Sequence, residues 1–383
     1  MESYAVQIRR RLHTYPEVGF ELTRTLELLR GELDKIGVEY TEKYGKSSIV
    51  ATVNPEKDAF TIGVRADIDA LPITERNDVP YRSRIDGQMH ACGHDAHTAI
   101  ALDTLRRVYE MRDRINCRVK FLFQSAEEYT TSGAKLMAED GVMDDIDCIV
   151  ALHCDTNYSA GQIGLSVAEQ NAISDGFMLD FYGKSVHAAQ QHKGVDAIMM
   201  AVRAYTDIEF MIAKEISAKE PALFNIGRIQ GGETNNVVAE HCSMFCTLRT
   251  HKQTIADTVI DKIKRIISAV ADTAGGRATF TQCKHYPVVV NHEVITERMR
   301  AAAEHVVGAE NIFPRNRGMG GEDFSYFCMR KPGCMFRLGV RNEERGIIHP
   351  LHTDCFDIDE DALEYGVRVF LRFILDNMNG IEC

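Results

Sequence analysis

Hydrophobic and polar positions follow a regular alternation of helical and strand spacing in the first part of the chain. Leucines recur every three or four residues between positions 22 and 33. This spacing predicts a helix within the stretch 21–40, with its end at Gly37. Short apolar runs predict strands at 47–53 and 60–67, a helix at 96–112, and further strands at 117–128 and 148–155. This succession is typical of an α/β domain with a mostly parallel central sheet flanked by helices.

A different spacing begins near residue 174. Alternating residues predict a half-exposed strand at 175–188, and a helical pattern follows at 194–212. The remaining pattern predicts a smaller α+β insert with about four strands and two helices, whose other elements are strands at 224–232, 242–250 and 278–287 and a helix at 254–276. We read the methionine-rich helix face at 198–205 as core.

The pattern returns to the first domain near His285, and a helix at 359–378 ends it. The predicted organisation is therefore a first domain formed by 1–173 and 285–383, interrupted by the insert 174–284.

Composition excludes several classes of protein. The chain has 383 residues and a formal net charge of −12 without a basic tract, which argues against nucleic acid and anionic membranes as partners. No apolar run approaches the ~20 residues that span a bilayer. The start lacks the apolar core of a signal peptide, so we expect a cytoplasmic protein whose 11 cysteines are free thiols.

Residues 89–97, MHACGHDAH, hold three histidines, a cysteine and an aspartate. Further donors follow three predicted strands, and the carboxyl ends of strands in open α/β sheets are where binding groups collect. These donors are Asp67, Asp69, Glu127, Glu128, His153 and Asp155, and His349 and His352 come late in the chain. We expect this set to converge with the cluster at 89–97.

Imidazole, thiolate and carboxylate together favour zinc, manganese, cobalt, nickel or iron over magnesium or calcium. Gly93 allows a tight turn in which Cys92 and His94 face one cation, and a thiolate can bridge two cations about 3.5–4 Å apart. The pair Glu127–Glu128 can divide its work. One carboxylate binds metal, while its neighbour takes a proton from water.

These motifs resemble the aminoacylase-like metallopeptidases, in the branch of hippurate hydrolase, indole-acetyl-amino-acid hydrolase and N-acetyldiaminopimelate deacetylase. The resemblance covers essentially the whole chain and rests on RADIDALPITE, MHACGHDAHTA, SAEE, GKSVHAA, NNVV, LRT, GGEDFSYF and PLHTDCF, in that order. It implies a cytoplasmic amidohydrolase that cleaves N-acyl-amino acids with two divalent metal ions per subunit (Zn, Mn, Co or Ni), and a homodimer formed through the insert.

The resemblance also implies individual roles. Cys92 is the bridging metal ligand, and the other ligands are His94, Glu128, His153 and His352. Glu127 is the general base and acid. His187 reaches a partner subunit's active site and stabilises the tetrahedral oxyanion. Asn236 and Arg249 hold the substrate's carboxylate, for which a guanidinium is suited by its two parallel hydrogen bonds. The insert is a lid and dimerisation domain.

Three departures from the family pattern affect the lid. Gln190 and Gln191 follow HAA where a proline is common, DAI replaces DPI, and NVVA replaces NVIP. They concern specificity, because none removes a predicted ligand.

Other interpretations stay open from the residues. The chain could be a dipeptidase with the same chemistry, a non-catalytic metal- or ligand-binding homologue, or a cysteine hydrolase that uses Cys92. His90 and His97 are not assigned as ligands, and His352 is preferred to His349. Asp95 is read as a helix cap or a partner of a ligand, and Asp69 as an orienting group or a solvated turn residue.

Overall fold

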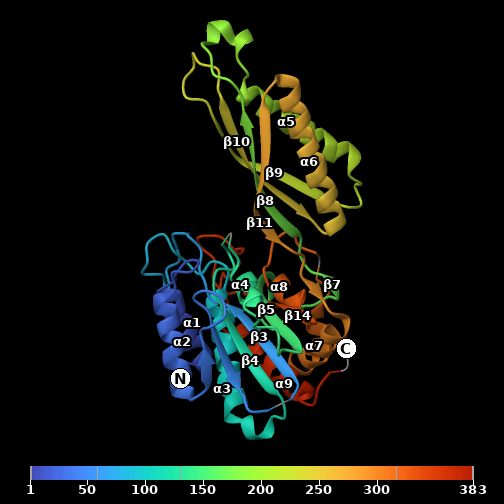
Figure 1. The fold of residues 1–383 in the computed structure, drawn as a ribbon. Coiled ribbons are helices and arrows are strands. Elements are labelled where there is room, and N and C mark those ends of the chain that lie inside the picture. Colours follow the sequence, from blue (N-terminus) through green and yellow to red (C-terminus); the bar gives the residue numbers. More distant parts are fainter. Residues whose placement is uncertain (1, 58, 130, 316, 382–383) are drawn as a thin grey trace. The chain divides into compact units, whose positions relative to one another are not determined.

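The computed structural model describes residues 2–57, 59–129, 131–315 and 317–381. The chain divides into two compact units (Figure 1). Unit 1 comprises 1–170, 289–316 and 323–383, and unit 2 comprises 171–288 and 317–322. Among the described residues, no helix combines the length and apolar character needed to cross a membrane.

Unit 1 is built on an eight-stranded mixed sheet in the order β1-β2-β4-β3-β5-β14-β6-β13. Its strands are β1 (Glu39–Thr41), β2 (Ile49–Val53), β3 (Thr61–Asp67), β4 (Arg118–Gln124), β5 (Cys148–Ser159), β6 (Ile163–Gly164), β13 (Ile312–Phe313) and β14 (Gly333–Arg341). The central strands β4, β3, β5 and β14 run parallel. The pairs β1–β2, β2–β4 and β14–β6 are antiparallel, and the edge strand β13 pairs parallel with β6. Because helices cover both faces, these central strands are nearly continuous apolar runs.

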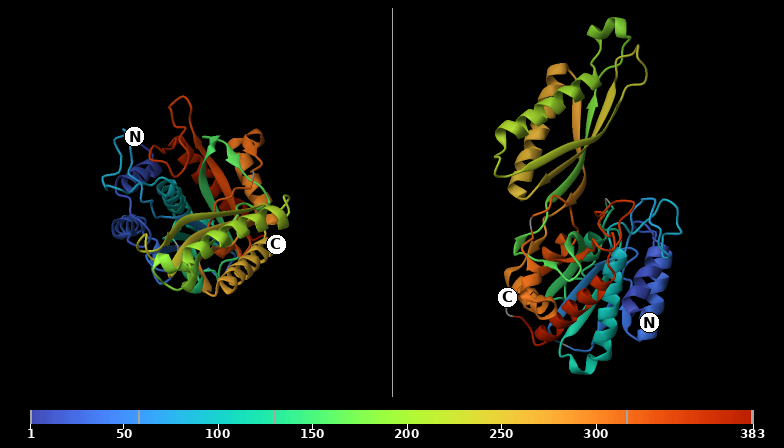
Figure 2. Two further views of the ribbon diagram at one scale, coloured as in Figure 1. Left: turned by 90° about the horizontal axis from the view of Figure 1, so that it is seen from above. Right: turned by 180° about the vertical axis from the view of Figure 1, so that it is seen from behind.

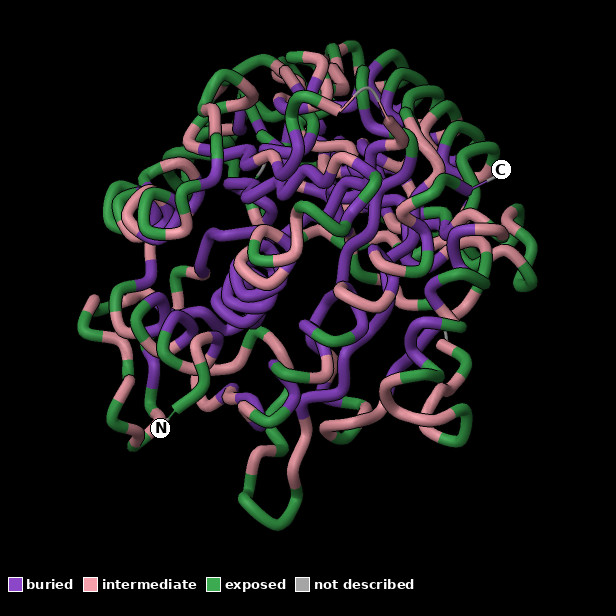
Figure 3. The backbone as a smooth tube through the Cα atoms, turned by 90° about the horizontal axis from the view of Figure 1, so that it is seen from below, coloured by how far each residue is buried: buried purple, intermediate pink, exposed green. Residues whose placement is uncertain are grey.

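Helices pack on both faces of this sheet (Figure 2). The larger core contains residues of five helices, namely α1 (Tyr4–Thr14), α2 (Thr23–Ile36), α3 (His94–Glu110), α7 (Glu293–Val307) and α9 (Asp361–Asn377). On the other face, α4 (Gly133–Glu139) and α8 (Ser325–Cys328) pack on a smaller core. All seven residues of β3 are buried, and Figure 3 shows the buried backbone gathered in the interior. The strand ends that carry the predicted donors are therefore held by packing on both sides.

Unit 2 has a four-stranded antiparallel sheet in the order β11-β8-β10-β9, with two helices against it. Its elements are β8 (Ile173–Tyr182), β9 (Ala222–Gly231), β10 (His241–Thr250), β11 (Arg277–Tyr286), α5 (Ala197–Glu215) and α6 (Gln253–Ala274). A separate short ladder in unit 1 pairs β7 (Ala168–Glu169) with β12 (Val290–Asn291), and short 3-10 turns lie at Arg112–Arg114, Ala188–Lys193 and Ala309–Asn311.

These elements confirm the predicted fold class, a mostly parallel α/β sheet with a smaller α+β insert. Gly37 ends α2 in the left-handed conformation, with φ 81°. One predicted boundary was wrong by two residues, because α3 begins at His94 rather than at residue 96. The prediction that the helix face 198–205 is core was also wrong in part. Met200 and Ala204 are buried, but Val202 is 54% exposed and Met199 is 48% exposed.

Candidate metal centre

The turn that carries the donor cluster depends on Gly93. This residue precedes α3 with φ 84°, a left-handed conformation that favours glycine. A Cβ atom there would also lie 3.1 Å from both Cβ and Sγ of Cys154. The turn places Cys92 just before the helix and His94 in its first turn, so both side chains project from one short, tightly packed segment.

The structure brings the five predicted ligands together in unit 1. Cys92 Sγ lies 3.5 Å from His153 Nε2 and 3.2 Å from His352 Nε2. His352 Nε2 in turn lies 3.0 Å from Glu128 Oε1. Two groups of donor atoms, each mutually within 4.8 Å, have Cys92 in common; they are Cys92–His94–His153 and Cys92–Glu128–His352. A thiolate shared between two donor groups is the arrangement expected of a bridging ligand.

The buried histidines are oriented by hydrogen bonds from their Nδ1 atoms. His153 Nδ1 donates to the carbonyl of Cys154 at 2.7 Å, and His94 Nδ1 donates to the carbonyl of Asp69 at 2.8 Å. These contacts leave each Nε2 to face the other donors. His94 Nε2 is buried and, within the described part of the chain, forms no hydrogen bond.

Asp69 positions the paired glutamates. Its two carboxylate oxygens accept hydrogen bonds from the backbone N–H groups of Glu127 (3.0 Å) and Glu128 (3.2 Å). Asp69 is 1% exposed, so the solvated-turn interpretation does not hold. Ala126, which precedes Glu127, has a φ of 53°, and the predicted ligand His352 has a φ of 63°. Left-handed conformations at residues other than glycine are strained, and such strain clusters at functional sites.

The charges of the site favour a cation. Burial opposes protonation of His94, but Asp67 and Asp69 outweigh burial and raise its pKa to about 10. Burial, together with Glu128 and Glu127, raises the pKa of the Cys92 thiol well above its usual range. The imidazole of His94 and the thiol of Cys92 thus keep their protons beside these carboxylates. A bound metal ion would supply the positive charge in place of those protons.

The residues therefore fit the expected metal ions. His94 Nε2 is an orphaned buried nitrogen, and thiolate, imidazole and carboxylate form the donor set. This set matches zinc and its neighbours in the first transition row.

A group of buried residues lies behind the ligands. The sequence indicated Asp67 and His97 as donors near the site, but it did not indicate Arg65. His97 Nδ1 donates to Asp67 at 2.5 Å, while its Nε2 accepts the Cys154 N–H at 2.8 Å. Both ring nitrogens of His97 are thus engaged away from the five donors. Asp67 also accepts a hydrogen bond from Arg65 at 2.8 Å. Burial opposes ionisation of Asp67, but Arg65, His94 and His97 hold its pKa well below its usual range. Arg65 lies in the RADID motif, but its strand pattern gave no sign of this role.

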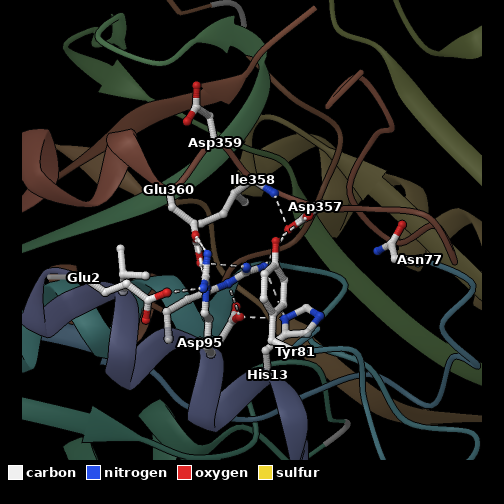
Figure 4. Close-up of polar contacts among 12 residues, drawn as sticks. Glu2, His13, Asn77, Tyr81, Asp95, Asp357, Ile358, Asp359 and Glu360 are labelled. Atoms are coloured by element: carbon white, nitrogen blue, oxygen red, sulfur yellow. Dashed lines mark hydrogen bonds and ion pairs between the residues drawn. The ribbon is translucent and has the colours of Figure 1, made fainter. Parts of the chain in front are cut away.

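Asp95 belongs to a second buried cluster (Figure 4). Its carboxylate accepts hydrogen bonds from Arg9 Nε at 2.8 Å and His13 Nδ1 at 2.7 Å, both from α1. His13 also contacts Glu75 at 3.2 Å, and Arg9 contacts Asp357 at 2.8 Å. Asp95 is therefore an ion-pair partner rather than a helix cap. No motif in the first 20 residues indicated this network.

His90, His349 and Asp155 belong to none of the groups of possible metal donors among the described residues. His90 is 1% exposed, and burial above all lowers its pKa to about 3. His349 is exposed. Asp155 uses Oδ1 to accept hydrogen bonds from the backbone and side chain of Asn157.

Unit 2 holds the other three predicted site residues at two places. The backbones of His187 and Asn236 adjoin, because His187 pairs with Val237 and the Ala188 N–H donates to the Asn236 carbonyl at 2.9 Å. Arg249 lies near the far end of β10 and donates to the carbonyl of Met319 at 2.8 Å. At about 3.3 Å per residue, β10 separates Arg249 from Asn236 by more than 20 Å.

Comparisons with known proteins agree with this geometry. The sequence profile of "Peptidase family M20/M25/M40" matches residues 63–376. Thermostable carboxypeptidase 1 of Saccharolobus solfataricus is 32% identical over 96% of this chain and 93% of its own length. N-acetyldiaminopimelate deacetylase of Priestia megaterium is 32% identical over 97% of this chain and 98% of its own length. A Bacillus subtilis structure described as a dinuclear metal-binding peptidase of the M20 family has a TM-score of 0.84 and 27% identity, over 98% of both chains.

Proposed function

The chain belongs to peptidase family M20/M25/M40, and from that premise we propose that it is a metal-dependent amidohydrolase of N-acyl-amino acids. Membership of the family confirms the resemblance drawn from the sequence motifs. The observation that carries the proposal is the convergence of four other donors on Cys92, with Glu127 beside them. Two relatives named as deacetylases of N-acetylated amino acids support the substrate class.

In the proposal, Cys92, His94, Glu128, His153 and His352 would hold two divalent cations, since Cys92 belongs to both groups of donor atoms. Bound divalent cations supply Lewis acidity, which polarises an amide carbonyl and makes water more acidic.

Glu127 is the proposed general base and acid. It is 5% exposed, and the hydrogen bond from its backbone N–H to Asp69 holds it next to the ligand Glu128. Its carboxylate takes a proton from the attacking water as the oxygen adds to the carbonyl carbon. It then delivers that proton to the nitrogen as the C–N bond breaks, giving a carboxylic acid and a free amine. A protein that only bound metal would not need Glu127 as a second carboxylate beside the ligand Glu128.

His187 is the proposed stabiliser of the oxyanion. Its Nδ1 accepts the Ala189 N–H at 3.1 Å, so the neutral ring carries its proton on Nε2 and can donate from there. Asn236 and Arg249 lie too far apart in one chain to hold the same carboxylate. Their proposed pairing therefore requires two copies of the chain, with His187 and Asn236 from one copy and Arg249 from the other.

We accordingly propose a homodimer formed through unit 2, which would also serve as a lid. The outer face of α5 and the edge strand β9 expose apolar side chains that a second copy would cover. These are Ile198, Met199, Val202, Tyr205, Leu223 and Ile229, each between 39% and 54% exposed.

The test is a substrate panel with metal-reconstituted protein. N-acetyl-, N-benzoyl- and indole-acetyl-amino acids should be hydrolysed, and dipeptides should be poorer substrates. Chelation should abolish the activity, whereas a cysteine hydrolase would survive it. Preferred turnover of dipeptides would instead favour a peptidase, an alternative supported by the carboxypeptidase relative. If the protein hydrolyses none of these substrates with Zn, Mn, Co or Ni, the result would favour a non-catalytic metal- or ligand-binding protein.

A further inference from the structure

Among the described residues, every buried Arg or Lys except one forms an ion pair with a carboxylate. Arg9, Arg65 and Lys120 are each at most 6% exposed, and each forms an ion pair with at least one Asp or Glu. Arg337 on β14 is 8% exposed, yet no carboxylate oxygen of the described residues lies within 4.0 Å of its guanidinium. Its Nε atom is buried and has no hydrogen-bond partner in the same part of the chain. A buried charge without a partner is costly, so its retention needs a reason.

Arg337 lies next to a proposed metal ligand. In the parallel ladder of β5 and β14 it pairs with His153, and paired residues of neighbouring strands project from the same face of the sheet. Burial and then the Arg337 charge lower the pKa of His153 well below its usual range, which agrees with this proximity.

The surroundings of Arg337 leave its charge unmatched. On its other side, in β6, it pairs with Gly164, over which the Tyr158 ring packs. The nearest acidic side chain along β5 is Asp155, which projects from the same face but uses Oδ1 for Asn157. The wall beside His153 is thus positively charged.

We propose that Arg337 binds a second carboxylate of the substrate, one other than the α-carboxylate. The inference rests on the proposed function for its substrates, and it assigns a preference for N-acyl-amino acids that carry an additional acid group. That group is either the acidic side chain of the amino acid or the free acid of a dicarboxylic acyl chain. A guanidinium can hold either with two parallel hydrogen bonds.

Matched substrates separate these sources. N-acetyl-glutamate is compared with N-acetyl-glutamine, and N-succinyl-methionine with N-butanoyl-methionine. In the wild type, kcat/KM for the acidic member of one pair should exceed that for the neutral member. Arg337→Met should lower kcat/KM for that acidic member by roughly 10- to 100-fold and change its neutral counterpart less than about 3-fold. Arg341→Gln is the control, because Arg341 is on the same strand and pairs with Glu343 at the surface.

Two further measurements exclude a structural role and test the site without hydrolysis. Arg337→Met should leave the melting temperature of the ligand-free protein unchanged or higher, since it removes an unpaired buried charge. By calorimetry, glutarate should bind the metal-loaded wild type more tightly than pentanoate, and Arg337→Met should abolish that difference.

Equal losses on acidic and neutral substrates, or a preference for glutarate that survives Arg337→Met or is absent from the wild type, would overturn the inference. If the wild type hydrolyses none of the amides, the proposed function fails, while the glutarate titration still decides on Arg337.

Discussion

Two largely buried polar clusters meet at the start of α3, and their charges are balanced in different ways. The Arg9 cluster comprises Arg9, Arg10, His13, Glu75, Asp95, Asp357 and Glu360, and the Cys92 cluster comprises the five proposed ligands. In the first, cationic and anionic side chains contact one another at 2.5–3.3 Å. In the second, lone pairs and negative charge face one another, and only protons relieve the repulsion.

The difference separates a cluster that stabilises the fold from one that needs a ligand. Asp95 lies in the first cluster and the adjacent His94 in the second. A network that is satisfied by its own partners contributes to folding, whereas unsatisfied donors mark a binding site. Three predictions test this distinction.

The largest effect is expected at Glu127. Glu127→Gln keeps the shape of the side chain but removes the base, so kcat should fall by roughly 10²- to 10⁴-fold. Metal content, measured by elemental analysis, should stay at the wild-type level. Glu139→Gln on α4 is the control, because that side chain is 54% exposed and should change neither quantity. Wild-type turnover in Glu127→Gln would disprove the assignment of the base.

The next effect is on stability, and it should differ between the clusters. Arg9→Met removes the guanidinium that Asp95 and Asp357 share, which should cost about 3–5 kcal/mol in the free energy of unfolding. Cys92→Ser should cost far less in the metal-free protein, although it should prevent normal metal loading. Urea unfolding of both metal-free variants gives the comparison. Arg345→Met, at a guanidinium that is 57% exposed, should lie within about 1 kcal/mol of the wild type. If Arg9→Met were as mild as this control, the Arg9 cluster would not be stabilising.

The third effect is on metal uptake as a function of pH. Metal-free His94, with its pKa raised to about 10, and the Cys92 thiol, with its pKa raised further above its usual range, are both protonated at pH 7. A metal ion must displace both protons, so affinity should rise with pH, by up to about 100-fold per unit, and uptake should release about two protons. Calorimetry in buffers of different ionisation enthalpy counts these protons. Uptake without proton release would contradict the proposed ligands.

The sequence predicted the Cys92 cluster because its donors stand at recognisable places. Glu128 follows the apolar strand β4, and His153 lies near the end of the apolar run in β5. Parallel strands bring such positions to one edge of the sheet. The longer strands other than β14, and the helices α2, α3, α5, α6 and α9, could be predicted for a related reason, since their spacing is repeated over many residues.

The Arg9 cluster and Arg337 could not be predicted in this way. Arg9 and Asp95 are 86 residues apart, and nothing local records that α1 packs against α3. Arg337 sits in an apolar strand, where only the burial and the missing partner reveal its significance. The exposed face of α5 has the same composition as a core face, so its pattern could not show which part meets solvent.

The short distance along α3 between His94 and Asp95 has a practical consequence for handling the protein. Consecutive helical residues point about 100° apart, so the two contacts together fix the rotation of the helix about its axis. Through Arg9 and His13, the amino-terminal helix α1 thereby holds α3, and with it the neighbouring ligand His94, in position. Shortening the chain before Thr14, or fusing a bulky tag there, would disturb catalysis even though every donor atom remained in place.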